Sequence, residues 1–138
     1  MDTLLTAGTL LVIDPDDKFS SLSVPPAGSG TAVVLNLKNG SDKLSKPRRI
    51  NMTNMPSAAI IKLESRDLDD DDNPEWWATF KTTHQPAHLG GSEDIHYYVN
   101  GYQKENFLQE GLGLLLVDKS EKPAKRDTLG KVTVIVSA

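Results

Sequence analysis

The densest group of reactive side chains in this sequence is DLDDDDNPEWW, residues 67–77. Within six positions it holds five aspartates, Asp67, Asp69, Asp70, Asp71 and Asp72. Closely spaced carboxylates offer the oxygen ligands that Ca²⁺ prefers, which makes Asp67, Asp69 and Asp71 candidate calcium ligands. The EF-hand pattern fails, because Asp72 stands where that loop needs glycine and Ala78 where it needs a bidentate glutamate. The sequence therefore favours the alternative, a solvated and charged hairpin loop.

The two tryptophans next to this run have different predicted environments. If residues 75–82 form a strand, side chains alternate between its faces, so Trp76 joins the apolar residues Ala78 and Phe80 in the core. Trp77 then shares the polar face with Thr79 and Lys81. An indole beside hydrogen-bonding groups is a stacking platform for a sugar ring, so Trp77, Thr79 and Lys81 are candidate ligand-binding residues for a carbohydrate or glycoconjugate. The alternative is that Trp77 packs against a neighbouring strand.

All three histidines, His84, His88 and His96, lie in the segment HQPAHLGGSEDIH. Imidazoles at close range can bind Zn²⁺, which would allow a metal-dependent enzyme. Their spacing matches no zinc motif, and Pro86 with the following glycine pair disfavours the helix that HExxH requires. The chain also lacks cysteine, a nucleophile elbow and a phosphate-binding loop. We therefore expect a lectin-like binding protein that is not an enzyme and has no cofactor apart from the calcium considered above.

Charge and hydropathy limit the partners. The net charge of −4 disfavours nucleic acid, whose phosphates are neutralised by lysine and arginine. Basic residues gather in residues 38–49 and 118–127, without the interleaved aromatics of single-strand binders. These segments are either solvated loops or contacts for the acidic loop of a neighbouring subunit. No apolar run is long enough to span a membrane and the start of the chain lacks a basic leader region, so we expect a cytoplasmic protein.

Short apolar runs separated by turn residues predict an all-β domain. In KVTVIVS, for example, Val132, Val134 and Val136 share one face. Only residues 101–111 have a helical pattern. The predicted strands cover residues 4–13, 32–38, 48–53, 58–64, 75–82, 94–100, 112–118 and 131–137. About eight strands in 138 residues fit one domain, 1–138, that is an antiparallel β-sandwich with Greek-key or jelly-roll connections. A small closed barrel is the alternative.

Two of these runs, TLLVI at residues 9–13 and LGLLLV at residues 112–117, are apolar on both faces. Such strands are either covered on both sides or exposed on an outer face that contacts another subunit. In a two-layer sandwich the second arrangement is favoured, which predicts a homo-oligomer. It also supports an alternative function, a self-assembling structural subunit of a coat, sheath, inclusion or appendage.

Overall fold

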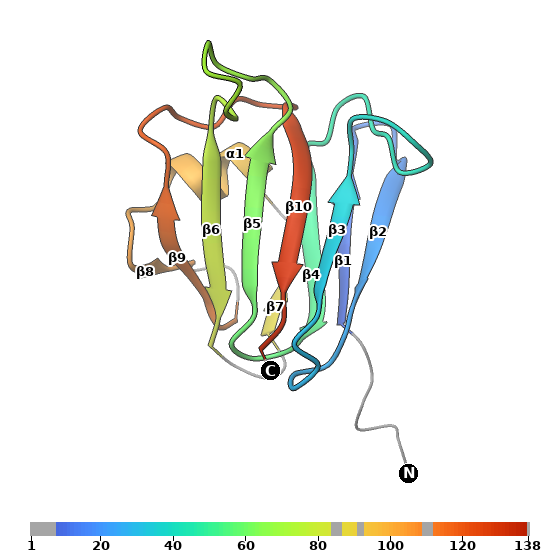
Figure 1. Cartoon of the computed structure of the whole chain (residues 1–138), viewed down its shortest axis with the longest axis vertical. Coiled ribbons are helices and arrows are strands. Elements are labelled where there is room, and N and C mark those ends of the chain that lie inside the picture. The colour runs from blue at the N-terminus through green and yellow to red at the C-terminus, as the bar shows by residue number, and fades with distance from the viewer. Residues whose placement is uncertain (1–7, 84–86, 91–92, 109–111, 138) are drawn as a thin grey trace.

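A computed structural model of the chain describes residues 8–83, 87–90, 93–108 and 112–137. These residues form two antiparallel sheets packed face to face, which confirms the predicted sandwich (Figure 1). The first sheet consists of β1 (Gly8–Ile13), β2 (Phe19–Val24), β4 (Arg49–Met55) and β7 (Ala87–Leu89). The second consists of β3 (Ala32–Asn36), β5 (Ile60–Ser65), β6 (Trp77–Thr82), β8 (Asn106–Phe107), β9 (Leu114–Lys119) and β10 (Leu129–Ile135). A short helix, α1 (Ile95–Asn100), lies between β7 and β8 in the chain.

The strand order is β2-β1-β4-β7 in the first sheet and β3-β10-β5-β6-β9-β8 in the second. β1 pairs with β2 and β5 with β6 as sequence neighbours, whereas β10 inserts between β3 and β5. Because β6 runs antiparallel to both β5 and β9, three connections meet at one end of the second sheet. They are the loop after β5, the segment after β9 and the segment before β10 (Figure 1).

The core between the sheets follows the predicted alternation. Val132, Val134 and Val136 are buried, as are the inward residues of β5, Ile61 and Leu63. Trp76 is 1% exposed, and its indole Nε1 donates to Thr128 Oγ1 at 2.8 Å. The prediction that Trp76 belongs to the core is confirmed, and its hydrogen bond ties the start of β6 to the start of β10.

The local predictions were wrong in four places, one of which is β7, because residues 87–89 were predicted as part of a loop. Residues 94–100, predicted as a strand, instead form α1, because Ile95, Tyr98 and Val99 bury one helical face at i, i+3 and i+4. The loop predicted after residue 13 contains β2, whose serines obscure its period of two. The described part of the predicted helix 101–111, which ends at residue 108, contains β8 and no helix.

The two runs that are apolar on both faces keep part of their outer faces open. On the first sheet, Leu11 and Ile13 are half-buried. On the second, Leu115 is half-buried and Val117 is exposed. The described residues contain no helix with the length and apolar character needed to cross a bilayer.

Candidate functional site

An open hollow of about 720 Å³ surrounds Trp77 on the outer face of the second sheet. β5 and β6 supply one side of it, and the loop after β5 and the segment after β9 supply the others. Its side chains are mostly charged or polar, so the indole is the main apolar surface within it. The lining residues are Lys62, Glu64, Asp69, Asn73, Pro74, Glu75, Trp77, Lys104, Asp118, Lys119, Ser120, Glu121 and Lys122.

Backbone and side-chain contacts hold Trp77 at this position. Its N–H donates to Ser120 Oγ at 3.0 Å, and the N–H of Ser120 donates to the Trp77 carbonyl at 3.0 Å. The segment after β9 is therefore fastened to the first residue of β6. Lys62, on the neighbouring strand β5, places its Nζ 5.9 Å from the centroid of the Trp77 ring, within the range of a cation–π contact. These contacts fix the backbone of Trp77 through Ser120 and place a cation over its ring through Lys62.

The three predicted ligand-binding residues lie on one face of β6, but they do not lie together in the hollow. Trp77 pairs with Glu64, Thr79 with Lys62 and Lys81 with Ile60 in the register with β5. Of the three, only Trp77 lines the hollow. Lys81 is exposed and lies near the opposite end of the strand.

Sequence reasoning missed the other walls of the hollow, above all Lys62 and Ser120. Alternation along residues 60–65 places Lys62 on the outer face of β5, but its position beside Trp77 depends on the hairpin register. Ser120 is 43 positions away from Trp77 in the chain, and no local sequence pattern indicates that the two residues are in contact.

The aspartate-rich segment forms a structured hairpin loop. Asp69 Oδ1 accepts hydrogen bonds from the backbone N–H groups of Asp71 and Asn73 at 2.9 and 3.0 Å. The N–H of Asp69 donates to the Asn73 carbonyl at 2.7 Å. One oxygen of Asp69 therefore stabilises the loop itself, as in an Asx turn.

Among the described residues, no three histidine, aspartate or glutamate side chains are grouped so as to hold a metal ion. The calcium site at Asp67, Asp69 and Asp71 stays a prediction that the geometry does not support.

The histidines belong to different elements. His88 lies in β7, where its Nδ1 accepts a hydrogen bond from the N–H of Asn54 at 3.2 Å. His96 lies in α1, not on a strand beside the loop as predicted, and its Nδ1 is buried without a hydrogen-bond partner. His84 lies outside the described residues. The described pair gives no support to a metal centre.

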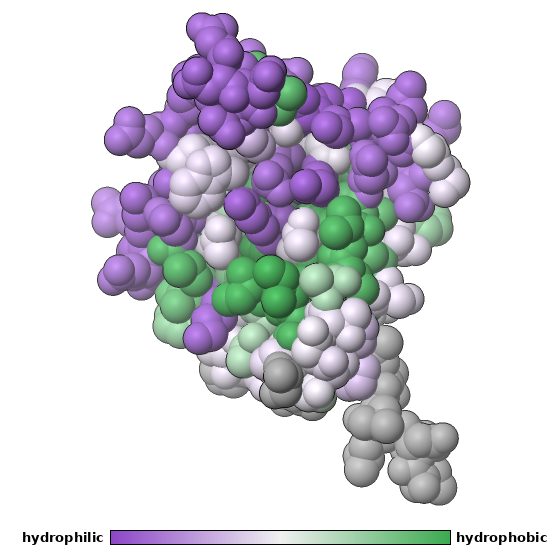
Figure 2. Space-filling view, viewed as in Figure 1, coloured by the Kyte–Doolittle hydropathy of each residue, from purple (hydrophilic) through white to green (hydrophobic). Residues whose placement is uncertain are grey.

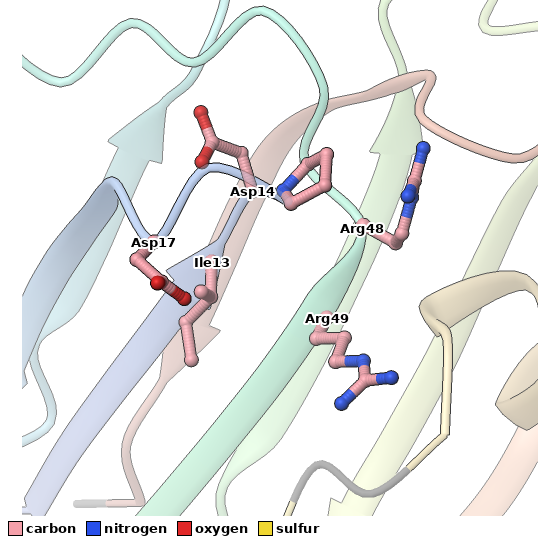
Figure 3. A pocket seen from close by; sticks show the side chains of 6 residues that line it. Ile13, Asp14, Asp17, Arg48 and Arg49 are labelled. Atoms are coloured by element: carbon pink, nitrogen blue, oxygen red, sulfur yellow. The ribbon is translucent and has the colours of Figure 1, made fainter.

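A second hollow of about 440 Å³ lies at the end of β1 and the start of β4 (Figure 3). Within it, Asp14 Oδ1 accepts hydrogen bonds from the N–H groups of Asp16 and Lys18, and Arg48 and Arg49 pair with Asp127 and Asp94. The side chains of Arg48 and Arg49 extend away from the acidic residues of the turn after β1 (Figure 3). This hollow therefore offers no converging set of free polar groups.

The two basic segments contact each other through their arginines, whereas their lysines Lys38, Lys43, Lys46, Lys122 and Lys125 are exposed, as in the solvated loops predicted from sequence. Arg48 donates to both carboxylate oxygens of Asp127, from Nε at 2.9 Å and from Nη2 at 2.7 Å. This hydrogen bonding lowers the pKa of Asp127. Arg49 and Arg126, one from each segment, both lie within 4 Å of Asp94, at 3.6 and 3.4 Å. The arginines of these segments therefore connect the two sheets through acidic partners.

In the Trp77 hollow, Asp118 Oδ1 forms a salt bridge with Lys104 and accepts a hydrogen bond from its Nζ at 3.0 Å. That hydrogen bond, together with the N–H of Lys119, lowers the pKa of Asp118. Lys119 Nζ donates to the carbonyls of Val99 and Tyr102 at 2.9 and 2.7 Å. Among the described residues, Glu75, Glu121 and Lys122 form no ion pair, so their side chains are available to a ligand.

Comparison with protein-family models, with curated proteins and with solved structures gives no significant match to this chain.

Proposed function

We propose that this protein binds carbohydrate, without catalysis, in the hollow around Trp77. The observation that carries the proposal is a half-buried indole on the solvent-facing side of a sheet, surrounded by polar side chains, on a residue whose backbone is fixed by Ser120. Sugar rings present an apolar face of C–H groups and an edge of hydroxyls. An indole can stack on the C–H face of the sugar, while carboxylates and ammonium groups bind its hydroxyls.

The hollow suits a short stretch of glycan. Its volume of about 720 Å³ lies within the range of small-ligand sites, and it is open to solvent, so a chain can enter and leave at its rim. The unpaired carboxylates of Glu75 and Glu121 supply hydrogen-bond acceptors for sugar hydroxyls. Preorganisation of Trp77 reduces the entropy lost on binding.

A glycan array probed with the wild-type protein, with and without Ca²⁺, tests the proposal. We expect binding to at least one glycan class, and Trp77→Ala to lower the affinity about tenfold or more, which corresponds to roughly 1.4 kcal/mol. Trp77→Phe keeps a smaller stacking surface and should retain part of the affinity. Phe107→Ala is the matched control, because Phe107 is an exposed aromatic residue on the same sheet outside the hollow.

Two results would overturn the proposal. One is a folded wild-type protein that binds no glycan under either condition. The other is a glycan affinity that Trp77→Ala and Phe107→Ala change equally.

A further inference from the structure

A patch of exposed apolar side chains lies on the outer face of the second sheet, away from the Trp77 hollow (Figure 2). The strand register places Ala32, Ile135 and Ile60 side by side across β3, β10 and β5. Val34, two positions along β3, is 53% exposed, and Ile135 is 48% exposed. The apolar patch is here defined as Val34, Ile60 and Ile135. Contiguous apolar side chains of this kind on a folded protein commonly mark a contact surface.

Two lysines without an acidic partner border the apolar patch. Lys81 on β6 pairs with Ile60, and Lys62 lies two residues after Ile60 on the same face of β5. Both are exposed, and within the described residues neither forms an ion pair. The nearby Lys131, by contrast, pairs with Glu64 at 3.5 Å. The patch therefore carries local positive charge on a chain whose net charge is −4.

The complementary surface is present elsewhere on the same chain, in residues 67–75, here called the acidic loop. Asp70, Asp71 and Asp72 are exposed, and among the described residues they form no ion pair. Leu68, in the same loop, is 49% exposed. The acidic loop thus combines an apolar side chain with negative charge, as the patch combines apolar side chains with positive charge.

The acidic loop cannot reach the apolar patch of its own molecule. The loop follows the last residue of β5, whereas Ile60 is the first, so about 17 Å of strand separates them. The hydrogen bonds of Asp69 and the bridge between Leu68 and Pro74 hold the loop in a fixed hairpin that projects from the end of the sheet (Figure 1). An acidic loop that contacts this patch must therefore come from another molecule.

We propose that the apolar patch binds the acidic loop of a second copy of this chain. The contact joins two different surfaces, so a pair of molecules keeps one free patch and one free loop, and further copies add head to tail. A contact made by one loop and one sheet face is smaller than a standard interface of about 1,600 Å², so the association is weak and depends on protein concentration. The contact shares Lys62 and part of the acidic loop with the lining of the Trp77 hollow, but it does not require that the hollow binds sugar.

The test compares association of single variants and of their mixture by analytical ultracentrifugation at about 100 µM protein, where weak contacts are populated. We expect wild-type oligomers at low salt that dissociate near 1 M salt, where the Debye length is about 3 Å. The patch variant combines Lys81→Glu with Ile135→Glu, and the loop variant combines Asp70→Lys with Asp71→Lys. Each alone should lower the association constant about tenfold or more.

The mixture decides between modes of association. The patch variant keeps its acidic loop and the loop variant keeps its patch, so an equal mixture should form dimers that contain one of each. Lys18→Glu and Asp16→Lys are the matched controls, because both residues are exposed in the turn after β1 and carry the same charges. They should associate as wild type does, as should Trp77→Ala.

Three results would overturn the proposal. A wild-type protein that stays monomeric at low salt would show that the proposed contact does not form. A loop variant that associates as strongly as wild type would assign the patch to a symmetric face-to-face dimer. A monomeric protein that binds vesicles of anionic lipid through Lys81 and Ile135 would assign the patch to a membrane surface.

Discussion

Replacing each tryptophan by phenylalanine separately tests whether adjacent indoles have the different roles that the structure assigns to them. Trp76 is 1% exposed and donates to Thr128 Oγ1 at 2.8 Å, whereas Trp77 is half-buried on the outer face. Trp76→Phe removes this hydrogen bond, which is worth about 1 kcal/mol. It also leaves a cavity of roughly 40 Å³, which costs about 1 kcal/mol more. With the transfer free energy of the lost ring atoms, we expect a total loss of about 2–3 kcal/mol.

Trp77→Phe should cost less than about 1 kcal/mol, because the lost cation–π contact with Lys62 is largely solvated. Urea unfolding followed by far-ultraviolet circular dichroism measures both free energies without relying on the mutated fluorophore. The emission of the remaining tryptophan gives a second readout. The Trp77→Phe protein should emit at shorter wavelength than the Trp76→Phe protein, because it retains only the buried indole.

The reasoning fails if the two substitutions cost the same free energy, or if Trp76→Phe costs less than about 1 kcal/mol. Thr128→Val provides an independent check on the hydrogen bond. It leaves the Trp76 N–H without its partner and should cost about 1–3 kcal/mol. Combined with Trp76→Phe, it should add only the cost of the exposed hydrogen bond that Thr128 Oγ1 donates to the Lys125 carbonyl, since both substitutions remove the contact between Thr128 and Trp76.

Two further predictions concern acid and a buried hydroxyl. The pKa values of Asp118 and Asp127 are lowered in the folded protein, by Lys104 and Arg48 respectively, so the unfolded state binds more protons in acid. The stability that these two carboxylates contribute is complete above about pH 5 and is lost as the pH falls through their folded pKa values. The urea midpoint of the wild-type protein should therefore drop in acid. A drop of the same size in the Asp127→Asn protein would contradict this explanation. Thr82 is fully buried, and its Oγ1 donates to the Pro56 carbonyl and accepts from the N–H of Ala59. Thr82→Val should cost about 2–3 kcal/mol in urea unfolding, against less than about 0.5 kcal/mol for Thr79→Val on the outer face, and equal costs would show that the hydroxyl is not needed.

The strands that could be predicted from sequence are those with a clear period of two. In β10 and β5, valine, isoleucine and leucine alternate with lysine, threonine and glutamate, so the buried face follows from the pattern alone. In residues 95–99, Ile95, Tyr97 and Val99 are spaced two apart as in a strand, whereas Ile95, Tyr98 and Val99 are spaced three and four apart as in a helix, so the pattern fits both. Packing against the rest of the protein then selects α1, because the helix buries Ile95, Tyr98 and Val99 together.

Two residues singled out from sequence line the candidate site, Trp77 as a stacking surface and Asp69 as a candidate calcium ligand. Trp77 could be found because alternation separates it from Trp76. Thr79 and Lys81 were chosen as neighbours by the same rule, yet residues two and four positions along an extended strand lie about 7 and 13 Å away. The side chains that line the hollow with Trp77 come from β5, the acidic loop and the segment after β9, which the register brings to one end of the sheet.

The sequence by itself determined the all-β class, the inward and outward faces of its clearest strands, and the separation of the two indoles, because a period of two is a local property of the chain. Only the tertiary structure decided which distant segments meet. Strand register and the crossing between sheets are set by burial of the whole core and not by neighbouring residues. They place Lys62 and Ser120 beside Trp77, and Ile60 and Ile135 together on a face bordered by lysines.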